Sequence, residues 1–404
     1  MEAPRADPAA GPLAGVRVVE FGTLIAGPFC SRILAEFGAE VVKIEAPGEG
    51  DPLRGWRKLY QGTSLWWYLQ ARNKKSVTVN LKHPEGAAVA RRLVSRADIV
   101  VENFRPGVME KLGLGWEALS EINPGLVMVR LSGFGQTGPR AAQPGFGAIG
   151  ESMGGLRYVT GFPDRPPVKT GVSIGDSIAA LWGAIGALMA LRHREVGGGR
   201  GQVVDVALYE AVFAMMESLV PEYDRAGFVR ERTGNVMPGI TPSNTHTSAD
   251  GRHVIIGGNG DAIFRRLMLA VGRPDLAEDP QLATNAGRDA RAGEIYGLLD
   301  RWVGERPADE VIRILSEADV PVSPVYSVAD MVRDPHFLSR GMIQTLVLPD
   351  GTTVKVPGIV PRLAGTPGSC RAAGPALGAD TDEALRELGY PDAEIERLHQ
   401  IGAI

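Results

Sequence analysis

The chain has 404 residues, of which 44% are hydrophobic and 22% charged, a composition typical of a globular protein. This length is sufficient for two domains, or for one large domain with an insertion. The formal net charge of −4 gives no electrostatic reason to expect nucleic acid as a partner. The two cysteines, Cys30 and Cys370, are too few for a disulfide scaffold and indicate a reducing cytoplasm. The histidines show no metal-ligand spacing, so we expect no metal site.

The N-terminus and the apolar runs give no sign of export or of membrane insertion. Residues 1–12 are rich in Ala and Pro and lack the apolar core of a signal peptide, so we predict a disordered tail. The most apolar run, residues 179–191, is interrupted by glycine and is too short for a membrane span. We therefore expect a cytoplasmic protein with no membrane partner.

The first part of the chain predicts a parallel sheet. Residues 16–21 and 39–45 are apolar runs typical of buried strands. Between them, Pro28 suits the first position of a helix that continues to Phe37, and Gly38 ends it. Two strands joined by one helix over this length form a βαβ unit, whose strands are parallel. Further strands are predicted at 76–81, 98–104, 125–132 and 202–206, with helices at 84–96 and 207–220.

In such sheets, ligands bind beyond the carboxyl ends of the strands. Three predicted loops lie at that edge, at residues 23–27, 103–105 and 133–138. The third contains the glycine pattern of a dinucleotide site and follows a strand. Residues 139–145 do not open a helix, however, so the helix N-terminus that would hold a pyrophosphate is missing. We therefore discount a nicotinamide or flavin site.

The composition changes near residue 226, which predicts a second domain. Residues 227–250 are polar and rich in glycine and proline. We expect a smaller inserted domain at 226–335, and a large domain built from 13–225 and 336–404. The elements expected inside the insertion are a strand at 253–258 and helices at 261–271, 288–301 and 308–317.

Gly175 and Asp176 precede a long apolar segment that ends in basic residues. Residues 177–191 are rich in Ala and Leu and predict a helix buried on several faces. Asp176 at its start has two interpretations. A carboxylate there can cap the unpaired N–H groups of the first turn. It can also be a nucleophile, because Gly175 lets a substrate approach closely. The local sequence favours the cap and leaves the nucleophile open.

A series of short motifs runs in order along the chain from residue 13. They are LAGVRV at 13–18, AGP at 26–28, GAEVVKIE at 38–45, NKKS at 73–76, VENFRPG at 101–107, LSGFG at 131–135, GD at 175–176, GRGQ at 199–202 and LGADTDE at 377–383. Together they resemble the class III CoA-transferases, the family of formyl-CoA and carnitine CoA-transferases. Each motif alone is weak, but their order over nearly the whole chain is specific.

The resemblance implies an α/β fold with a doubly wound parallel-sheet large domain built from both chain ends, a smaller inserted α/β domain, and an interlocked homodimer. It also implies that Asp176 is the catalytic nucleophile and forms an aspartyl-CoA thioester. No cofactor would be tightly bound, because the coenzyme A ester is itself a substrate. By position, the family's CoA-binding residues correspond to Ile25, Ala26, Val79, Asn80, Leu81, Lys82, Asn103, Phe104, Arg105 and Lys111.

Cations and N–H groups should line the path of CoA, since it carries a pyrophosphate and a 3′-phosphate. Lys74, Lys75 and Lys111 are candidates, and the alternative for each is a solvated surface charge. Ile25 stands where formyl-CoA transferases have an amide side chain, and Ala46 stands where they have an arginine. Formate and oxalate specificity are therefore in doubt.

Residues 144–151 and 239–244 look more like the succinyl-CoA-dependent hydroxydicarboxylate transferases. We therefore expect succinyl-CoA as the donor and malate or citramalate as the acceptor, with itaconate, mesaconate, glutarate or oxalate as alternatives. A buried second carboxylate needs a cation or converging donors. Phe146, Asn244 and His246 are the candidate substrate residues.

Two other functions are open to the same residues. An α-methylacyl-CoA racemase would keep the aspartate and use a histidine in the preceding loop to move the α-proton. Residues 143–153 contain no histidine, which disfavours a racemase. A non-catalytic CoA-binding protein would need no nucleophile, and the intact Gly175-Asp176 pair disfavours it.

Overall fold

The computed structural model describes residues 11–404, so nearly all of the predicted tail at 1–12 lies outside the described residues. The chain divides into two compact units. Among the described residues, the larger consists of 11–156, Lys169–Pro221 and Ser339–Ile404, and the smaller consists of Arg157–Val168 and Glu222–Leu338.

The segment Arg157–Val168 groups with the smaller unit, although the sequence analysis assigned it to the large domain. Contacts distant in sequence account for this. The N–H of Gly234 donates to the carbonyl of Gly161 at 2.9 Å, and Arg232 donates to the carbonyl of Tyr158 at 3.0 Å. Composition alone does not reveal such pairing.

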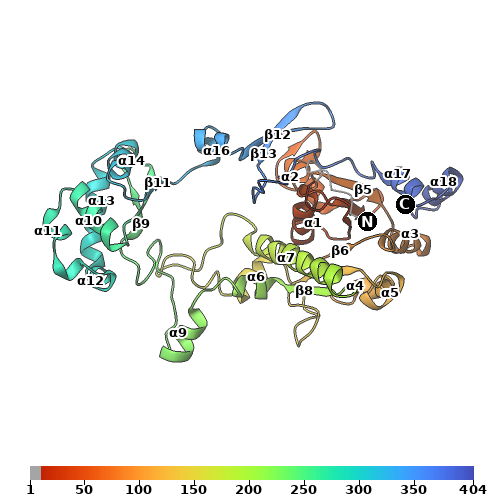
Figure 1. Ribbon diagram of the computed structural model, residues 1–404, viewed down its shortest axis with the longest axis horizontal. Coiled ribbons are helices and arrows are strands. Elements are labelled where there is room, and N and C mark those ends of the chain that lie inside the picture. Colours follow the sequence, from red (N-terminus) through yellow and green to blue (C-terminus); the bar gives the residue numbers. More distant parts are fainter. Residues whose placement is uncertain (1–10) are drawn as a thin grey trace. The chain divides into compact units, whose positions relative to one another are not determined.

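The larger unit is built on a six-stranded sheet (Figure 1). Its strand order is β5-β2-β1-β6-β7-β8, and every neighbouring pair is parallel. The predicted α/β fold with a large parallel sheet is therefore confirmed. The strands are β1 (Arg17–Glu20), β2 (Glu40–Glu45), β5 (Lys74–Thr78), β6 (Ile99–Glu102), β7 (Val127–Ser132) and β8 (Val203–Ala207). The order reverses between β1 and β6, and at such a switch point the loops that follow the two strands diverge and leave a crevice.

Helices cover both faces of this sheet, and apolar strand residues form a buried cluster with the helices on each face. On one face, α1 (Ala26–Glu36) and α7 (Ile174–Val196) pack against β1, β6 and β7. On the other face lie α3 (Pro84–Val94), α5 (Trp116–Ile122), α17 (Thr381–Glu387) and α18 (Asp392–Gln400). Many residues of α7 that face the sheet are alanine, and the small side chains allow close packing.

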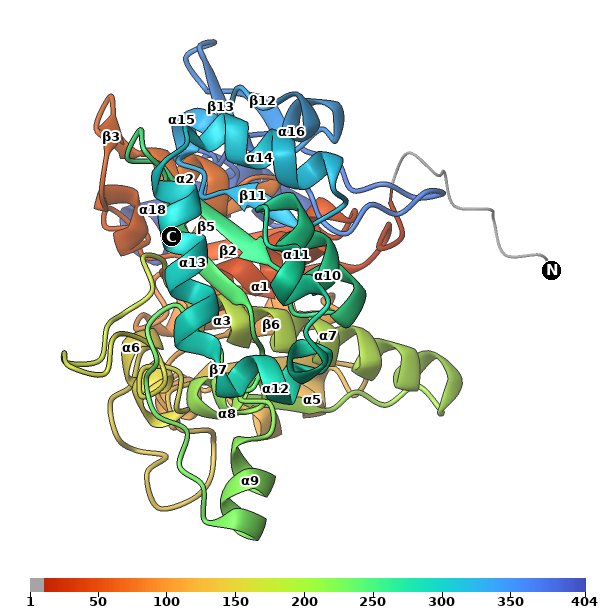
Figure 2. The same ribbon diagram turned by 90° about the vertical axis from the view of Figure 1, so that its left-hand side faces the viewer.

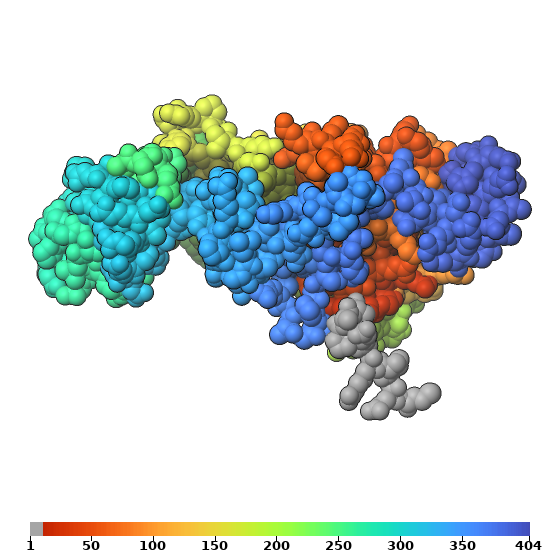
Figure 3. Space-filling model, turned by 90° about the horizontal axis from the view of Figure 1, so that it is seen from above, coloured from red at the N-terminus to blue at the C-terminus, as the bar shows by residue number. Residues whose placement is uncertain are grey.

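The chain's C-terminal segment completes the larger unit. The N–H of Asn80 donates to the carbonyl of Ala403 at 2.9 Å, and the N–H of Ser76 donates to the Asp380 carboxylate at 2.7 Å. Figure 3 shows this segment, in dark blue, against the part of the chain coloured orange. The C-terminal segment therefore lies beside β5 and the residues that follow it.

The remaining elements of the larger unit are short. They are η2 (Pro52–Gly55), β3 (Leu59–Tyr60), β4 (Thr63–Ser64), α2 (Leu65–Gln70), α4 (Val108–Lys111), α6 (Gly147–Met153), α8 (Leu208–Phe213), β12 (Ile343–Val347) and β13 (Thr353–Pro357). The predicted helix at 207–220 is interrupted, since α8 ends at Phe213 and α9 (Leu219–Ala226) begins only at Leu219. A dinucleotide site would need a helix directly after the glycine pattern at 133–138. No helix begins between residue 133 and Gly147, so this site is absent there.

The smaller unit packs helices on a three-stranded antiparallel sheet of order β11-β10-β9 (Figure 2). Its core joins Val254 and Ile256 to apolar residues of three helices, including Phe264, Leu299 and Leu315. The elements are β9 (Ser243–Thr247), β10 (His253–Gly257), α10 (Asp261–Ala270), α11 (Pro274–Ala277), η3 (Pro280–Leu282), α12 (Asn285–Ala290), α13 (Ala292–Gly304), α14 (Ala308–Glu317), β11 (Val322–Pro324), α15 (Val328–Met331) and α16 (Pro335–Ser339). The helix expected at 288–301 is divided between α12 and α13.

Candidate active site

A cavity of about 500 Å³ opens at the switch point of the sheet. The loops that follow β1, β6 and β7 line it, together with α6 and the start of α7. This is the edge at which the sequence analysis expected a ligand. The lining is mainly apolar, and its charged side chains are Arg105, Glu151, Lys169 and Asp176.

Asp176 lies in this cavity as the third residue of α7. The N-cap position of this helix is Ser173, which makes no side-chain capping hydrogen bond, and Asp176 lies within the first turn, so the interpretation of Asp176 as the N-cap residue is wrong. Its carboxylate accepts a hydrogen bond from the N–H of Gly147. A Cβ atom on Gly147 would lie 2.0 Å from Oδ2 of Asp176, which is less than any real contact. The position of the carboxylate therefore depends on a glycine at 147.

The pKa of Asp176 is raised from its ordinary value to about 6. Burial is the main cause, because the charged form loses hydration, and the nearby Glu151 carboxylate adds repulsion. The N–H groups of Gly147 and of Asp176 itself, and the Lys169 ammonium, act in the opposite direction. At neutral pH the group is still mostly ionised, but it is a stronger base than an exposed aspartate.

Glu151, on α6, is the site residue that the sequence analysis missed. It is only 2% exposed, and its Oε1 accepts the N–H of Gly175 at 3.3 Å. A Cβ atom on Gly175 would lie 2.8 Å from the carbonyl oxygen of Gly147, so the missing side chain lets α6 and α7 come together. The available signal was the spacing: Glu151 follows Gly147 by four residues and therefore shares its helix face.

The loop after β1 forms one wall of the cavity and is held by side chains from three other segments. Asn103 accepts the N–H of Thr23 at 2.8 Å and donates to the carbonyl of Thr23 at 2.9 Å. Both oxygens of Asp51 accept the N–H of Leu24 at 3.1 Å, and Leu24 has a left-handed φ of 64°. Gln70 donates to the carbonyl of Ile25 at 3.1 Å. The loop is thus fixed in an unusual backbone conformation.

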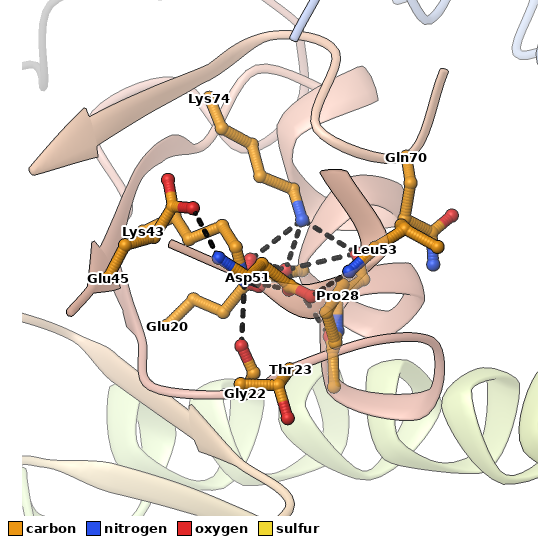
Figure 4. A network of polar contacts seen from close by, with 12 residues as sticks. Glu20, Gly22, Thr23, Pro28, Lys43, Glu45, Asp51, Leu53, Gln70 and Lys74 are labelled. Atoms are coloured by element: carbon orange, nitrogen blue, oxygen red, sulfur yellow. Dashed lines mark hydrogen bonds and ion pairs between the residues drawn. The ribbon is translucent and has the colours of Figure 1, made fainter. Parts of the chain in front are cut away.

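A buried group of charges lies behind this loop (Figure 4). The Lys43 ammonium contacts Glu20 Oε1 at 2.7 Å, Asp51 Oδ2 at 2.8 Å and the carbonyl of Gly22 at 2.7 Å. The Lys74 ammonium contacts Glu20 Oε2 at 2.7 Å and the carbonyl of Pro28 at 2.7 Å. These lysines therefore connect the carboxylates to the two ends of the loop.

The pKa values of this group reflect its pairing. Burial alone would raise the pKa of Glu20, but Lys43 and Lys74 hold it at about 2. Burial also lowers the pKa of Lys74, to about 8, against the attraction of Glu20. Lys74 is therefore a paired core residue, and the structure contradicts both the CoA contact and the solvated charge that the sequence analysis considered for it. Lys75 is paired with Glu40 at 3.1 Å near the surface.

Nine of the ten residues predicted to bind CoA line two hollows. Ile25, Ala26, Asn103, Phe104 and Arg105 line the cavity that holds Asp176. Val79, Asn80, Leu81 and Lys82 line a second hollow of about 620 Å³. Thr23 and Phe104 line both, so the two hollows adjoin along these residues. Lys111 is exposed at the end of α4 and lines neither.

The three predicted substrate residues are not all in one place. Phe146 lines the Asp176 cavity and is 66% exposed. Asn244 and His246 lie on β9 of the smaller unit. The His246 side chain is buried, with Nδ1 2.6 Å from Asp300 Oδ1, whereas its Nε2 has no hydrogen-bond partner among residues 11–404. Among residues 11–404, no group of three or more His, Cys, Asp and Glu side chains is arranged to hold a metal ion.

The family model described as CoA-transferase family III matches residues 13–381. The chain belongs to this family. The predicted resemblance to class III CoA-transferases, and with it the prediction of an enzyme, is therefore confirmed.

Relatives with assigned activities also match nearly the whole chain. It is 51% identical over 378 residues to the succinyl-CoA–D-citramalate CoA-transferase of Chloroflexus aurantiacus, covering 93% of this chain and 94% of that protein. It is 45% identical over 392 residues to the alpha subunit of a succinyl-CoA–L-malate CoA-transferase from Chloroflexus aurantiacus, covering 96% and 91%. Among solved structures, a CAIB/BAIF family protein from Brucella suis superposes with a TM-score of 0.83 at 33% identity, covering 94% of this chain and 100% of that one.

Proposed function

We propose that this family III CoA-transferase moves CoA from succinyl-CoA to a short dicarboxylic acid such as citramalate or malate. The observation that carries the mechanism is the Asp176 carboxylate, which lies in a cavity at the switch point with its pKa raised to about 6. The choice of substrates is supported by the two Chloroflexus aurantiacus relatives, whose names specify succinyl-CoA with citramalate or malate.

The proposed reaction proceeds through covalent intermediates on Asp176. The carboxylate attacks the thioester carbonyl of succinyl-CoA, which forms a mixed anhydride and expels the CoA thiolate. The thiolate then attacks the aspartyl carbonyl, releasing succinate and leaving an aspartyl-CoA thioester. The acceptor carboxylate attacks this thioester, giving a second anhydride and the thiolate. In the last step the thiolate attacks the acceptor carbonyl, which produces the new acyl-CoA and frees Asp176. No net proton transfer is required.

Residues around Asp176 suit these steps. The raised pKa makes the carboxylate more basic and hence a better nucleophile, while only roughly a tenth of it is protonated at pH 7. The N–H of Gly147 donates to the Asp176 carboxylate, which lies in the first turn of α7, so both would face the oxyanion that forms when a thiolate or carboxylate attacks the aspartyl carbonyl. They would stabilise these oxyanions without rearrangement.

The two adjoining hollows fit a long CoA molecule. The acyl end would react at Asp176 in the first hollow, and the nucleotide would extend past Phe104 into the second, along residues 79–82. Lys82 and Arg105 would provide positive charge for the phosphates. Lys111, outside both hollows, remains a predicted contact. The predicted absence of a tightly bound cofactor also remains part of this proposal.

A homodimer is supported by an uncovered apolar face on α7. Leu181, Ile185, Leu188 and Met189 recur at helical spacing and are each more than 40% exposed.

Among residues 11–404, α7 is also the one helix that is long and apolar enough to cross a membrane by length and composition, and 44% of its most apolar 18-residue stretch is buried inside the protein. The apolar run at 179–191, predicted to be too short for a membrane span, is only part of this helix, which has 23 residues.

A second copy of the chain would cover this face, and light scattering should then give twice the chain mass in the absence of detergent. A monomeric mass would contradict the dimer. Because one relative is called an alpha subunit, a pairing with a different chain is the alternative outcome. The two cysteines are both free, which agrees with the cytoplasmic location that we propose.

Two experiments test the chemistry and the substrates separately. Incubation with succinyl-CoA and hydroxylamine should convert Asp176 to a hydroxamate, which peptide mass spectrometry would locate. Absence of the adduct under turnover would contradict the aspartyl intermediate. A screen of CoA transfer from succinyl-CoA to citramalate, malate, glutarate, itaconate, mesaconate, oxalate and butyrate should rank the first two highest by kcat/KM. A preference for butyrate would contradict the dicarboxylate assignment and leave the CoA-transferase intact.

The racemase alternative is not supported by the cavity. No histidine is among the residues that line it, and a racemase would need a second acid or base beside the α-carbon. Measurement of α-proton exchange in deuterated water with a 2-methylacyl-CoA should show no incorporation at the rate of CoA transfer.

A further inference from the structure

The charges that line the Asp176 cavity are balanced before any substrate enters. Glu151 and Asp176 are acidic, and Arg105 and Lys169 are basic. A dicarboxylic substrate brings a further negative charge at its distal end. In a mainly apolar cavity that already holds two carboxylates, such a charge is costly unless a cation pairs with it. One of the two cations should therefore face the distal carboxylate.

The two cations differ in their position along the path of CoA. Arg105 follows Phe104, and Phe104 lines both the first hollow and the second. Lys169 lines only the first hollow, on the segment that leads through Ser173 into α7. Arg105 is thus near the CoA side of the cavity, and Lys169 is on the wall that carries the nucleophile.

Lys169 is also available for a ligand. Its side chain is exposed, and none of the ion pairs within residues 11–404 involves its ammonium group. The positive charge nevertheless reaches the reaction centre, because it lowers the pKa of Asp176. A long lysine side chain can keep its ammonium group hydrated in the free enzyme and deliver it to a bound anion.

We infer that Lys169 binds the distal carboxylate of the dicarboxylic substrates while Asp176 reacts at the other end. This inference rests on the proposed function, since only a dicarboxylic substrate has the second charge. It makes Lys169 a specificity-determining residue that favours dicarboxylic over monocarboxylic acyl groups of equal length. Glu151 makes this pairing more important, because its buried carboxylate lines the same cavity and repels a distal carboxylate that has no cation beside it.

The test compares two exchange reactions that differ only in the distal group. Succinyl-CoA with labelled succinate carries the carboxylate, and butyryl-CoA with labelled butyrate replaces it by a methyl group. Lys169→Met should lower kcat/KM for the succinyl pair at least tenfold and change the butyryl pair less than twofold. Lys169→Arg should restore most of the preference. Lys355→Met, at an exposed lysine on β13, serves as the matched control and should change neither.

Arg105→Met should instead lower both reactions by similar factors, since it would act through CoA. An equal loss of both reactions in Lys169→Met, or no loss in either, would overturn the inference. The wild-type enzyme separates this from failure of the proposed function. If the wild type prefers the succinyl pair and Lys169→Met keeps that preference, only the role of Lys169 is wrong. If the wild type exchanges both pairs equally, the dicarboxylate function fails, and the inference with it.

Discussion

Two groups of acidic residues in the larger unit lie in surroundings of opposite character. Glu20 is buried between two lysine ammonium groups, which hold its pKa at about 2 although burial alone would raise it. Asp176 lies beside a second acid, and burial together with Glu151 raises its pKa to about 6. Glu20 therefore keeps its charge and can serve as a fixed anchor for the loop after β1. Asp176 loses an unfavourable charge when it forms a covalent bond.

The difference has consequences for stability as well as for chemistry. A group whose pKa is lowered by folding stabilises the fold above its unfolded pKa, and Glu20 loses this contribution as the pH falls toward 2. A carboxyl group whose pKa is raised has the opposite effect. Asp176 binds its proton more tightly in the folded state, so its ionisation reduces stability as the pH rises from about 4 to 6. Ionised Glu20 therefore stabilises the fold, whereas ionised Asp176 destabilises it.

The largest expected effect on activity comes from removing the Asp176 carboxylate. Asp176→Ala should lower turnover by ~10³-fold or more, because every proposed step passes through this carboxylate. The fold should be retained, and at pH 7 the free energy of unfolding should not fall, since the ionised group is unfavourable there. Urea denaturation followed by circular dichroism measures this. Near wild-type turnover would remove Asp176 from the mechanism.

Removal of a cation from the anchor should mainly affect the fold. Lys43→Met leaves the Glu20 and Asp51 carboxylates without their shared partner in the core, which should cost about 3–5 kcal/mol of unfolding free energy. Lys75→Met is the matched control on β5. Its exposed pairs with Glu40 and Glu387 predict a loss of only about 0–1 kcal/mol. Equal losses in the two variants would show that the buried group has no special role.

Displacement of the nucleophile without removing it tests the importance of its position. Gly147→Ala places a methyl group where Asp176 Oδ2 lies, so the carboxylate must move, and kcat should fall by about 10²-fold. Gly171→Ala is the control, because a Cβ atom there meets nothing within 4 Å. Unchanged kcat in Gly147→Ala would show that catalysis does not depend on this position of the Asp176 carboxylate.

The smallest expected effect is a shift in pH dependence. With succinyl-CoA, the acid limb of kcat/KM for the wild type should lie near pH 6, where Asp176 becomes ionised. Glu151→Gln removes the repulsion and should move this limb to lower pH. The limb should stay above the ordinary aspartate range, because burial remains the larger cause. Glu195→Gln, on the exposed last turn of α7, should leave it unchanged, and an upward shift in Glu151→Gln would contradict the interpretation.

Much of the fold could be predicted from the sequence, because local patterns decide it. Apolar runs bounded by glycine and proline predicted β1, β2, β6 and β7 to within about three residues, and the short βα connections made them parallel. The position of Asp176 at the start of a long helix followed from the same kind of pattern. The chain order of the motifs then indicated the family, since no single motif was specific.

What the sequence by itself determined is therefore the parallel sheet, the loops at its binding edge, the helix that carries Asp176, and the family. The tertiary structure decided the environment of each charge. Lys74 is buried because Glu20, 54 residues earlier, lies beside it, and Glu151 acts on Asp176 because two glycines let α6 meet α7. Local patterns set backbone conformation through short-range sterics and hydrogen bonds. The pKa and the role of a charged side chain depend on burial and on partners distant in sequence, which only the folded chain brings together.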